Sequence, residues 1–191
     1  MKSKDQILKI KAVVLYILGR VPEGMDYIHL TKLLYFAQKE HLVQYGLPIM
    51  DDSFYAKKHG PVPSLTYKVL KFVEKGENFE DATMQSFKKS LRVEKHDDVP
   101  IVFANSTFDR DELSKSNIKV LDRIIDEYLD VNSFKLAELA HDKAWKEAYN
   151  SAKRTGDDTK IPIYDIAAAG GAKKAMLNVI RERQWVENQL R

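Results

Sequence analysis

Histidines are the residues of this sequence best suited to metal binding or acid–base catalysis. Its five histidines stand at positions 29, 41, 59, 96 and 141, and no two of them are three or four residues apart. Structural zinc sites usually combine His and Cys ligands at such short spacings, and the chain contains no cysteine. The missing cysteines also exclude disulfide bonds and a thiol nucleophile. The sequence therefore gives no indication of a metal site.

Three pairs of adjacent carboxylates have an ordinary structural interpretation. Asp51-Asp52, Asp97-Asp98 and Asp157-Asp158 each stand in a turn-like context. Carboxylates in turns commonly accept hydrogen bonds from nearby backbone N–H groups. The motifs of serine hydrolases, zinc proteases, P-loop proteins and calcium-binding loops are missing from the sequence. An enzyme remains an alternative, with His59 as its candidate general base.

Gly170-Gly171-Ala172-Lys173 resembles a phosphate-binding loop only in part. It lacks the upstream glycine and the hydroxyl residue that follows the lysine in such loops. We therefore expect a helix kink or close packing at this glycine pair.

A few aromatic and basic residues are candidates for contact with a partner protein. Tyr35 lies on a helix whose apolar positions extend too far around for a surface helix, so the helix is either buried nearly all round or presents an aromatic side chain to a partner. Trp145 stands one helical turn after His141, and a buried indole is the favoured alternative to a binding pocket. Lys57, Lys58 and His59 form a polar loop between two helices, a common location for recognition.

Composition indicates a globular protein rather than a nucleic-acid or membrane protein. Hydrophobic residues make up 44% of the 191 residues and charged residues 31%. The net charge of +3 is nearly balanced, and we find no helix-turn-helix pattern, which argues against DNA binding. The apolar cluster from 12 to 18 is too short for a membrane span, and no signal-peptide cleavage site follows it. We expect a cytoplasmic location.

The first half of the chain predicts three helices. Ser3 and Gln6 have capping-box spacing ahead of a helix that ends near Leu18 or Gly19. Asp26 is the expected N-cap of a central helix over 27–45, which Gly46 ends. A third helix is predicted from Pro63 or Ser64 to Lys75, with Gly76 as its stop. The chain from 49 to 62 is expected to be a compact connection with a turn at Gly60-Pro61.

The second half predicts a β-hairpin followed by more helices. Residues 91–94 alternate in polarity and 99–103 form a short apolar run, with a turn between them. A short helix within 79–90 is an alternative for the segment before the hairpin. Ser114 and Ser133 are the expected N-caps of two further helices, and helical spacing continues or restarts over 141–149. Residues 156–163 are expected on the surface, and a last helix over 165–187 is expected to break at the glycine pair. The fold class is therefore mostly α (α+β), a single-domain helical bundle around a central helix with a small antiparallel β-hairpin.

Two sequence blocks resemble the signature of the SocA-like antitoxins, also called the Panacea domain family and formerly described as phage-associated proteins. The first block comprises KLLYFAQ at 32–38, Gly46-Leu47-Pro48, Ala56 and HGPV at 59–62. The second comprises Leu113-Ser114, Leu139-Ala140-His141 and Trp145. On this resemblance we assign residues 1–155 to the family domain. Residues 156–191 are expected to be a helical extension packed on that domain.

The resemblance implies a bacterial antitoxin of a type II toxin–antitoxin system, a non-enzymatic module whose partner is a protein toxin. It implies no metal and no cofactor. We expect direct neutralisation of the toxin, with partner contacts from Tyr35, Lys57, Lys58, His59 and Trp145, and with Gly60, Pro61 and Val62 shaping the loop. Alternatives are an adaptor that delivers the toxin to an ATP-dependent protease, and a DNA-binding autoregulator.

Overall fold

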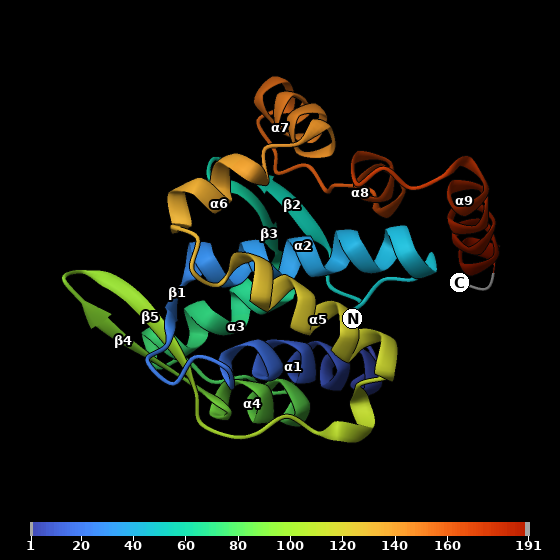
Figure 1. The fold of residues 1–191 in the computed structure, drawn as a ribbon. Helices are drawn as coiled ribbons and strands as arrows, with labels where there is room; N and C mark the ends of the chain where they lie inside the picture. Colours follow the sequence, from blue (N-terminus) through green and yellow to red (C-terminus); the bar gives the residue numbers. More distant parts are fainter. Residues whose placement is uncertain (1, 190–191) are drawn as a thin grey trace.

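The structure is a computed structural model that describes residues 2–189. Helix α2 (Tyr27–Tyr45) lies at its centre (Figure 1). Its N-cap is Asp26, whose carboxylate accepts a hydrogen bond from the His29 N–H, and Gly46 ends it in the left-handed conformation with φ of +65°. Every residue from 30 to 38 is buried. The apolar positions alone explain only one face of this helix, so burial all round requires neighbours on every side. The structure confirms the first of the two alternatives for α2.

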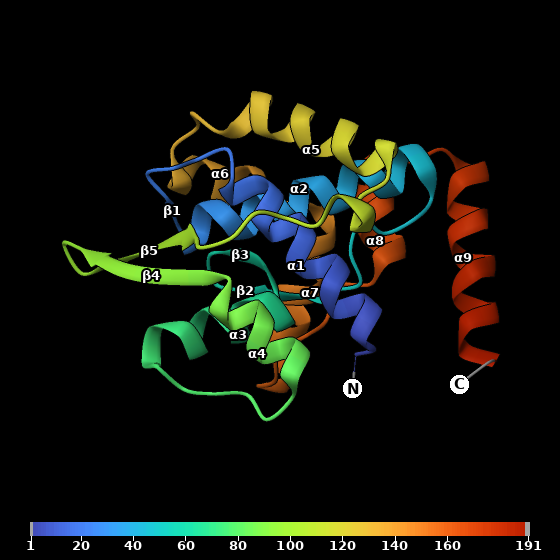
Figure 2. The same ribbon diagram turned by 90° about the horizontal axis from the view of Figure 1, so that it is seen from below.

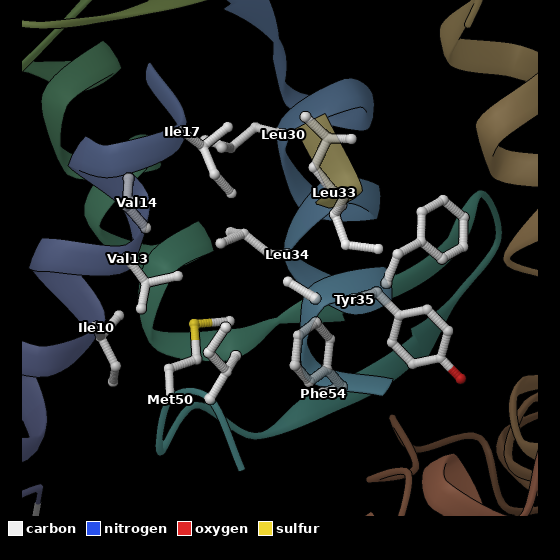
Figure 3. Close-up of a cluster of buried hydrophobic side chains, with 14 of the residues drawn as sticks. Ile10, Val13, Val14, Ile17, Leu30, Leu33, Leu34, Tyr35, Met50 and Phe54 are labelled. Atoms are coloured by element: carbon white, nitrogen blue, oxygen red, sulfur yellow. The ribbon is translucent and has the colours of Figure 1, made fainter. Parts of the chain in front are cut away.

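Helix α1 (Lys4–Leu18) packs against α2 and runs in the opposite direction (Figure 1). The predicted capping box is present, since the Ser3 hydroxyl and the Gln6 side chain each bond to the other residue's backbone. Figure 3 shows Val13, Val14 and Ile17 of α1 directed at Leu30 and Leu34 of α2. Burial of such aliphatic side chains supplies the main driving force for folding.

Two antiparallel β elements accompany the helices. The predicted hairpin is confirmed as β4 (Leu91–His96) and β5 (Val99–Ala104), and β1 (Met25–Asp26) adds a short third strand to β5. A second hairpin, β2 (Phe54–Lys57) and β3 (Gly60–Pro63), pairs Phe54 with Pro63 and Lys57 with Gly60. The sequence predicted only a connection with a turn here, and that prediction is wrong.

The missed hairpin has a physical explanation. Two prolines in four residues disfavour a strand, since proline cannot donate to a ladder. Here β3 lies against α2, and β2 lies against α7 (Lys143–Thr155) and bridges to Lys160. Tertiary packing therefore stabilises strands that the local sequence disfavours.

Helix α3 (Ser64–Lys75) begins directly after β3, as predicted, and Gly76 ends it with φ of +71°. Its N-terminus is capped from a distance, because the Asp52 carboxylate accepts hydrogen bonds from the N–H groups of Leu65 (2.9 Å) and Thr66 (2.8 Å). The short helix before the β4–β5 hairpin is α4 (Ala82–Lys89), which packs against α1 and α3.

Further helices from the C-terminal half of the chain pack against α2. Ser114 caps α5 as predicted, but the N-cap of α6 is Asn132, and Ser133 is its first helical residue. The prediction of Ser133 as the cap is wrong because the side-chain Oδ1 of Asn132 accepts from the Phe134 N–H, while the Ser133 hydroxyl donates to Asp26. Asp142 is the N-cap of the next helix, α7. The elements are η1 (Arg110–Glu112), α5 (Lys115–Tyr128), α6 (Ser133–Leu139) and α7 (Lys143–Thr155).

The chain after α7 returns to the core before the last helices, α8 (Ile163–Ala169) and α9 (Lys174–Gln189). Ile161 is buried and its N–H donates to the Phe54 carbonyl (2.8 Å), so the expectation of a wholly surface connection is wrong. The predicted break at the glycine pair is present. A side chain at Gly170 would meet Val43 (2.7 Å) and Lys39 (2.8 Å), so glycine permits the close approach of α8 to α2.

Across residues 2–189, none of the helices combines the length and apolar content that a bilayer crossing requires.

Candidate functional site: a surface hairpin tied to a buried polar cluster

The tip of the β2–β3 hairpin presents Lys58 and His59 to solvent. Lys57 and Gly60 form the last pair of the ladder, so Lys58 and His59 are the two residues of the turn. Gly60 has φ of +98°, a conformation that L side chains rarely adopt. The two side chains at the turn are thus held on a defined backbone.

Lys32 of α2 is buried directly beneath this tip. Its ammonium donates a hydrogen bond to the Pro61 carbonyl (2.8 Å) and lies 3.3 Å from the Thr31 hydroxyl oxygen. A side chain at Gly60 would stand 2.7 Å from Lys32 Cε, so the lysine occupies the space that glycine leaves. Burial lowers the pKa of Lys32 to about 7, because desolvation disfavours the charged form. Lys32 therefore holds β3 against the central helix at an electrostatic cost.

Trp145 of α7 holds the other strand. Its indole N–H donates to the Lys57 carbonyl (3.0 Å), and its ring is stacked between His141 (3.7 Å between centroids) and Tyr149 (4.7 Å). The pKa of His141 is lowered by burial, and to a smaller extent by the nearby Lys32 and His59. A neutral imidazole stacked on the indole is the arrangement that these shifts favour.

Asp142 joins α7 to the central helix. Its Oδ1 caps α7 by accepting from the Trp145 N–H (3.1 Å). Its Oδ2 accepts from the Tyr35 hydroxyl (2.9 Å) and from the Lys39 ammonium (3.1 Å). Burial is also the main reason that the pKa of Tyr35 is raised, with the Asp142 charge contributing. A mostly buried carboxylate with a cation and two further donors is well compensated.

The structure divides the predicted site residues into two groups. Tyr35 is 0% exposed and Trp145 is 7% exposed, so the prediction that these two contact a partner directly is contradicted by their burial. Figure 3 shows Tyr35 packed beside Phe54 inside the molecule. Lys58 and His59 are exposed and Lys57 is half-buried, with its ammonium paired to Asp158. Whether these three bind a partner stays a prediction.

Gly60, Pro61 and Val62 lie where they can shape the loop, as predicted. Gly60 supplies the positive φ and Pro61 supplies the carbonyl that Lys32 binds. Val62 pairs with Tyr55 in the ladder. The three residues thus contribute to the backbone geometry of the hairpin.

Sequence reasoning missed Lys32, Lys39 and Asp142, although one signal was available. Lys32, Tyr35 and Lys39 are spaced i, i+3 and i+7, so they share one face of α2. Two lysines on a buried helix face require carboxylate or carbonyl partners, because an unpaired buried charge is unfavourable. Only the fold supplies those partners, from β3 and from the start of α7.

The cluster has the character of a scaffold rather than of a reaction centre. Its lysines, tyrosine and carboxylate are bonded to one another or to backbone, and the part presented outward is the hairpin tip. Among residues 2–189, no three His, Asp or Glu side chains are grouped to hold a metal ion. The arrangement can therefore present a fixed surface to a macromolecule.

Comparison with known proteins places this cluster within one family signature. The family model described as "Antitoxin SocA-like, Panacea domain" matches residues 30–146, a range that includes most of α2, both hairpins and the start of α7. Searches of curated proteins and of solved structures gave no match. Lys32, Tyr35, Gly60, Pro61, Asp142 and Trp145 all fall inside the matched range.

Proposed function

Since this chain belongs to the SocA-like antitoxin (Panacea domain) family, we propose that it is the antitoxin of a type II toxin–antitoxin pair and neutralises a protein toxin by direct binding. The family match suggests the antitoxin role. The observation that supports direct binding is the hairpin tip, which is exposed at Lys58 and His59 yet fixed from below by two different helices.

A rigid, basic tip is well suited to recognition. Holding the backbone in one conformation before binding lowers the entropy lost on association. Exposed cations next to partly apolar surface also steer an acidic partner and anchor it. Leu139 of α6, which is 46% exposed, stands two residues before His141, whose ring lies beside Gly60, and supplies apolar surface at this end of α6. We propose that the toxin covers the tip and this part of α6.

The buried cluster has a supporting part in this proposal. Lys32, Tyr35, Asp142 and Trp145 position the tip without touching the toxin. Changes in the cluster should weaken toxin binding only as far as they disturb the hairpin. Changes at Lys58 and His59 should weaken binding and leave the fold intact.

Domain organisation follows the same proposal. We propose that residues 1–155 form the antitoxin domain and that 156–191 is a C-terminal extension packed on it. The bridge between Tyr55 and Lys160 and the contact of α8 with α2 support the packing of this extension.

The test is affinity capture of the tagged protein expressed from its native locus, followed by mass spectrometry. We expect one small co-encoded protein at equal stoichiometry, which is toxic when expressed alone and harmless when the antitoxin is present. The double variant Lys58→Ala, His59→Ala should lose the captured protein and the protection. The chain offers a matched control in Lys95→Ala, His96→Ala, because the same Lys-His pair stands beside the turn of β4–β5.

Other outcomes of the capture experiment would overturn or revise the proposal. Capture of the protein alone, together with no toxicity after its deletion, would overturn the antitoxin proposal. A shorter toxin half-life in the presence of this protein, with protease subunits captured alongside, would replace direct neutralisation by delivery to an ATP-dependent protease. Retention of toxin by the Lys58→Ala, His59→Ala variant would move the interface away from the tip.

A further inference from the structure

A groove of about 590 Å³ separates the C-terminal half of α9 from the body of the molecule. One wall is formed by α9 residues, including Arg183 and Glu187, and the opposite wall by the segments 46–54 and 160–163. Figure 2 shows α9 standing beside α8 and the end of α2, with its C-terminal end extending past them. The volume lies within the range of pockets that enclose ligands, roughly 300–1,000 Å³.

One wall of the groove carries an unpaired strand edge. Lys160 bridges to Tyr55 of β2, and the bonds of this bridge run from the Ala56 N–H to the Thr159 carbonyl (3.0 Å) and from the Ile161 N–H to the Phe54 carbonyl (2.8 Å). Lys160 and Tyr55 therefore form a non-hydrogen-bonded pair of an antiparallel ladder. In such a pair, the backbone N–H and carbonyl of Lys160 point away from β2. Within residues 2–189, neither group of Lys160 has a hydrogen-bond partner.

A buried amide on the groove wall also has an open donor. Gln38 is 0% exposed, and its Oε1 accepts hydrogen bonds from the N–H groups of Ile49 (3.0 Å) and Met50 (3.4 Å). Its Nε2 has no partner among the described residues, although Gln38 is one of the residues that line the groove. A buried N–H left unpaired is unfavourable, so an acceptor from a ligand would stabilise this site.

The remaining lining defines the kind of ligand. Leu47, Pro162 and Ile163 contribute accessible apolar surface, while Lys160 and Arg183 are balanced by Asp51 and Glu187 around the opening. Balanced charges complement a ligand without net charge. A peptide in extended conformation offers alternating N–H and carbonyl groups to a strand edge and side chains to apolar walls.

We propose that this groove binds an extended, uncharged peptide segment of a partner protein, which pairs as an added strand with Lys160 and offers a carbonyl to Gln38. The site lies at the Phe54 end of β2, whereas the Lys58–His59 tip lies at the other end. This inference goes beyond the antitoxin function and does not depend on it.

The experiment selects heptapeptides from a random display library on the full chain and measures their affinity by fluorescence anisotropy. Lys160→Pro removes the free N–H from the strand edge, whereas Lys160→Ala removes only the charged side chain. We expect selected peptides to lose at least about tenfold in affinity for the proline variant and to bind the alanine variant nearly as well as the natural protein. Thermal unfolding of both variants provides the check on folding.

A second measurement uses only the natural protein. Each selected peptide is N-methylated at one position after another, which removes main-chain donors and keeps the side chains. Binding by strand addition predicts a loss of about tenfold or more at specific, alternating positions. Failure to enrich any peptide, equal affinity for the proline and alanine variants when both fold, or insensitivity to N-methylation would each overturn the proposal.

Discussion

The two β-hairpins of this molecule carry the same Lys-His pair but are held in different ways. β4–β5 has six-residue strands, projects from the body in Figures 1 and 2, and turns at Asp97 and Asp98, both of which have positive φ. β2–β3 has four-residue strands and lies between α2 and α7. Its turn is tied to the core by Lys32 and Trp145.

This difference shows two origins of a hairpin. β4–β5 follows from local pattern, since a turn joins two short runs of strand-forming residues. β2–β3 follows from partners distant in the sequence, which lie 29 residues away for Lys32 and Pro61 and 88 residues away for Trp145 and Lys57. The position of the Lys58–His59 tip therefore depends on the fold as a whole.

The largest loss of stability is expected when Trp145 is replaced. Trp145→Ala removes a buried indole, two stacking contacts and the hydrogen bond to the Lys57 carbonyl. We expect a loss of about 3–5 kcal/mol in the free energy of unfolding, measured by urea denaturation. Trp185→Ala is the matched control, because Trp185 is 65% exposed and its replacement should change stability by less than about 0.5 kcal/mol. Equal effects of the two changes would contradict the structure.

The next largest effect is a pH dependence of the free energy of unfolding that originates at Lys32. Its pKa is about 7 in the folded chain and 10.5 without burial, so between these values the unfolded chain binds more protons than the folded one. Stability that comes from this group therefore rises with pH through that range. Relative to Lys32→Met, the natural protein should gain more than about 1.4 kcal/mol between roughly pH 6.5 and pH 9.5, the equivalent of one pKa unit. Denaturation curves for both proteins at each pH make the measurement, and a constant difference would show that burial does not lower the pKa of Lys32.

A smaller effect is expected at Gly60. Gly60→Ala places a side chain at positive φ and within 2.7 Å of Lys32 Cε. Gly76→Ala has similar backbone strain but nothing within 4 Å, so it isolates the conformational part. We expect losses of about 1–3 kcal/mol at Gly60 and about 1 kcal/mol at Gly76. If the loss at Gly60 did not exceed that at Gly76, Lys32 would not be packed against the tip as described.

The smallest effect is expected in the projecting hairpin. Asp98 has φ of +65°, and Asp98→Gly would relieve this conformation in a two-residue turn that favours glycine. We expect stabilisation of about 0.5 kcal/mol, seen as a small rise in Tm, with no change in capture of the partner by the Lys58–His59 tip. A change in capture would indicate that the two hairpins act together.

The helices could be predicted from the sequence to a large extent because their signals are local. The caps Ser3, Asp26 and Ser114 and the stop at Gly46 were all recognised from residue type and spacing. The turn at Asp97 and Asp98 was recognised in the same way. Ser133 was misassigned as a cap because Asn132, immediately before it, is an equally good cap by type.

The candidate site could be predicted only in part. The exposed Lys58 and His59 and the half-buried Lys57 were identified from their polarity between two helices. Tyr35 and Trp145 were also identified, but their burial depends on partners that lie far away in the sequence, Asp142 for Tyr35 and Lys57 for Trp145. Lys32 was recognised in the family motif but not as part of the site, since a lysine in an apolar helix is interpreted as a surface residue until its partner is known.

The sequence by itself determined the helical framework, one hairpin and the family, because propensity, caps and short motifs act over a few residues. Only the tertiary structure decided that GPVP forms a strand, that Lys32 is buried beneath it, and that Asp142 joins α2 to α7. The physical reason is that a buried charge or carbonyl is stable only beside its partner. Those partners meet only when the whole chain has folded.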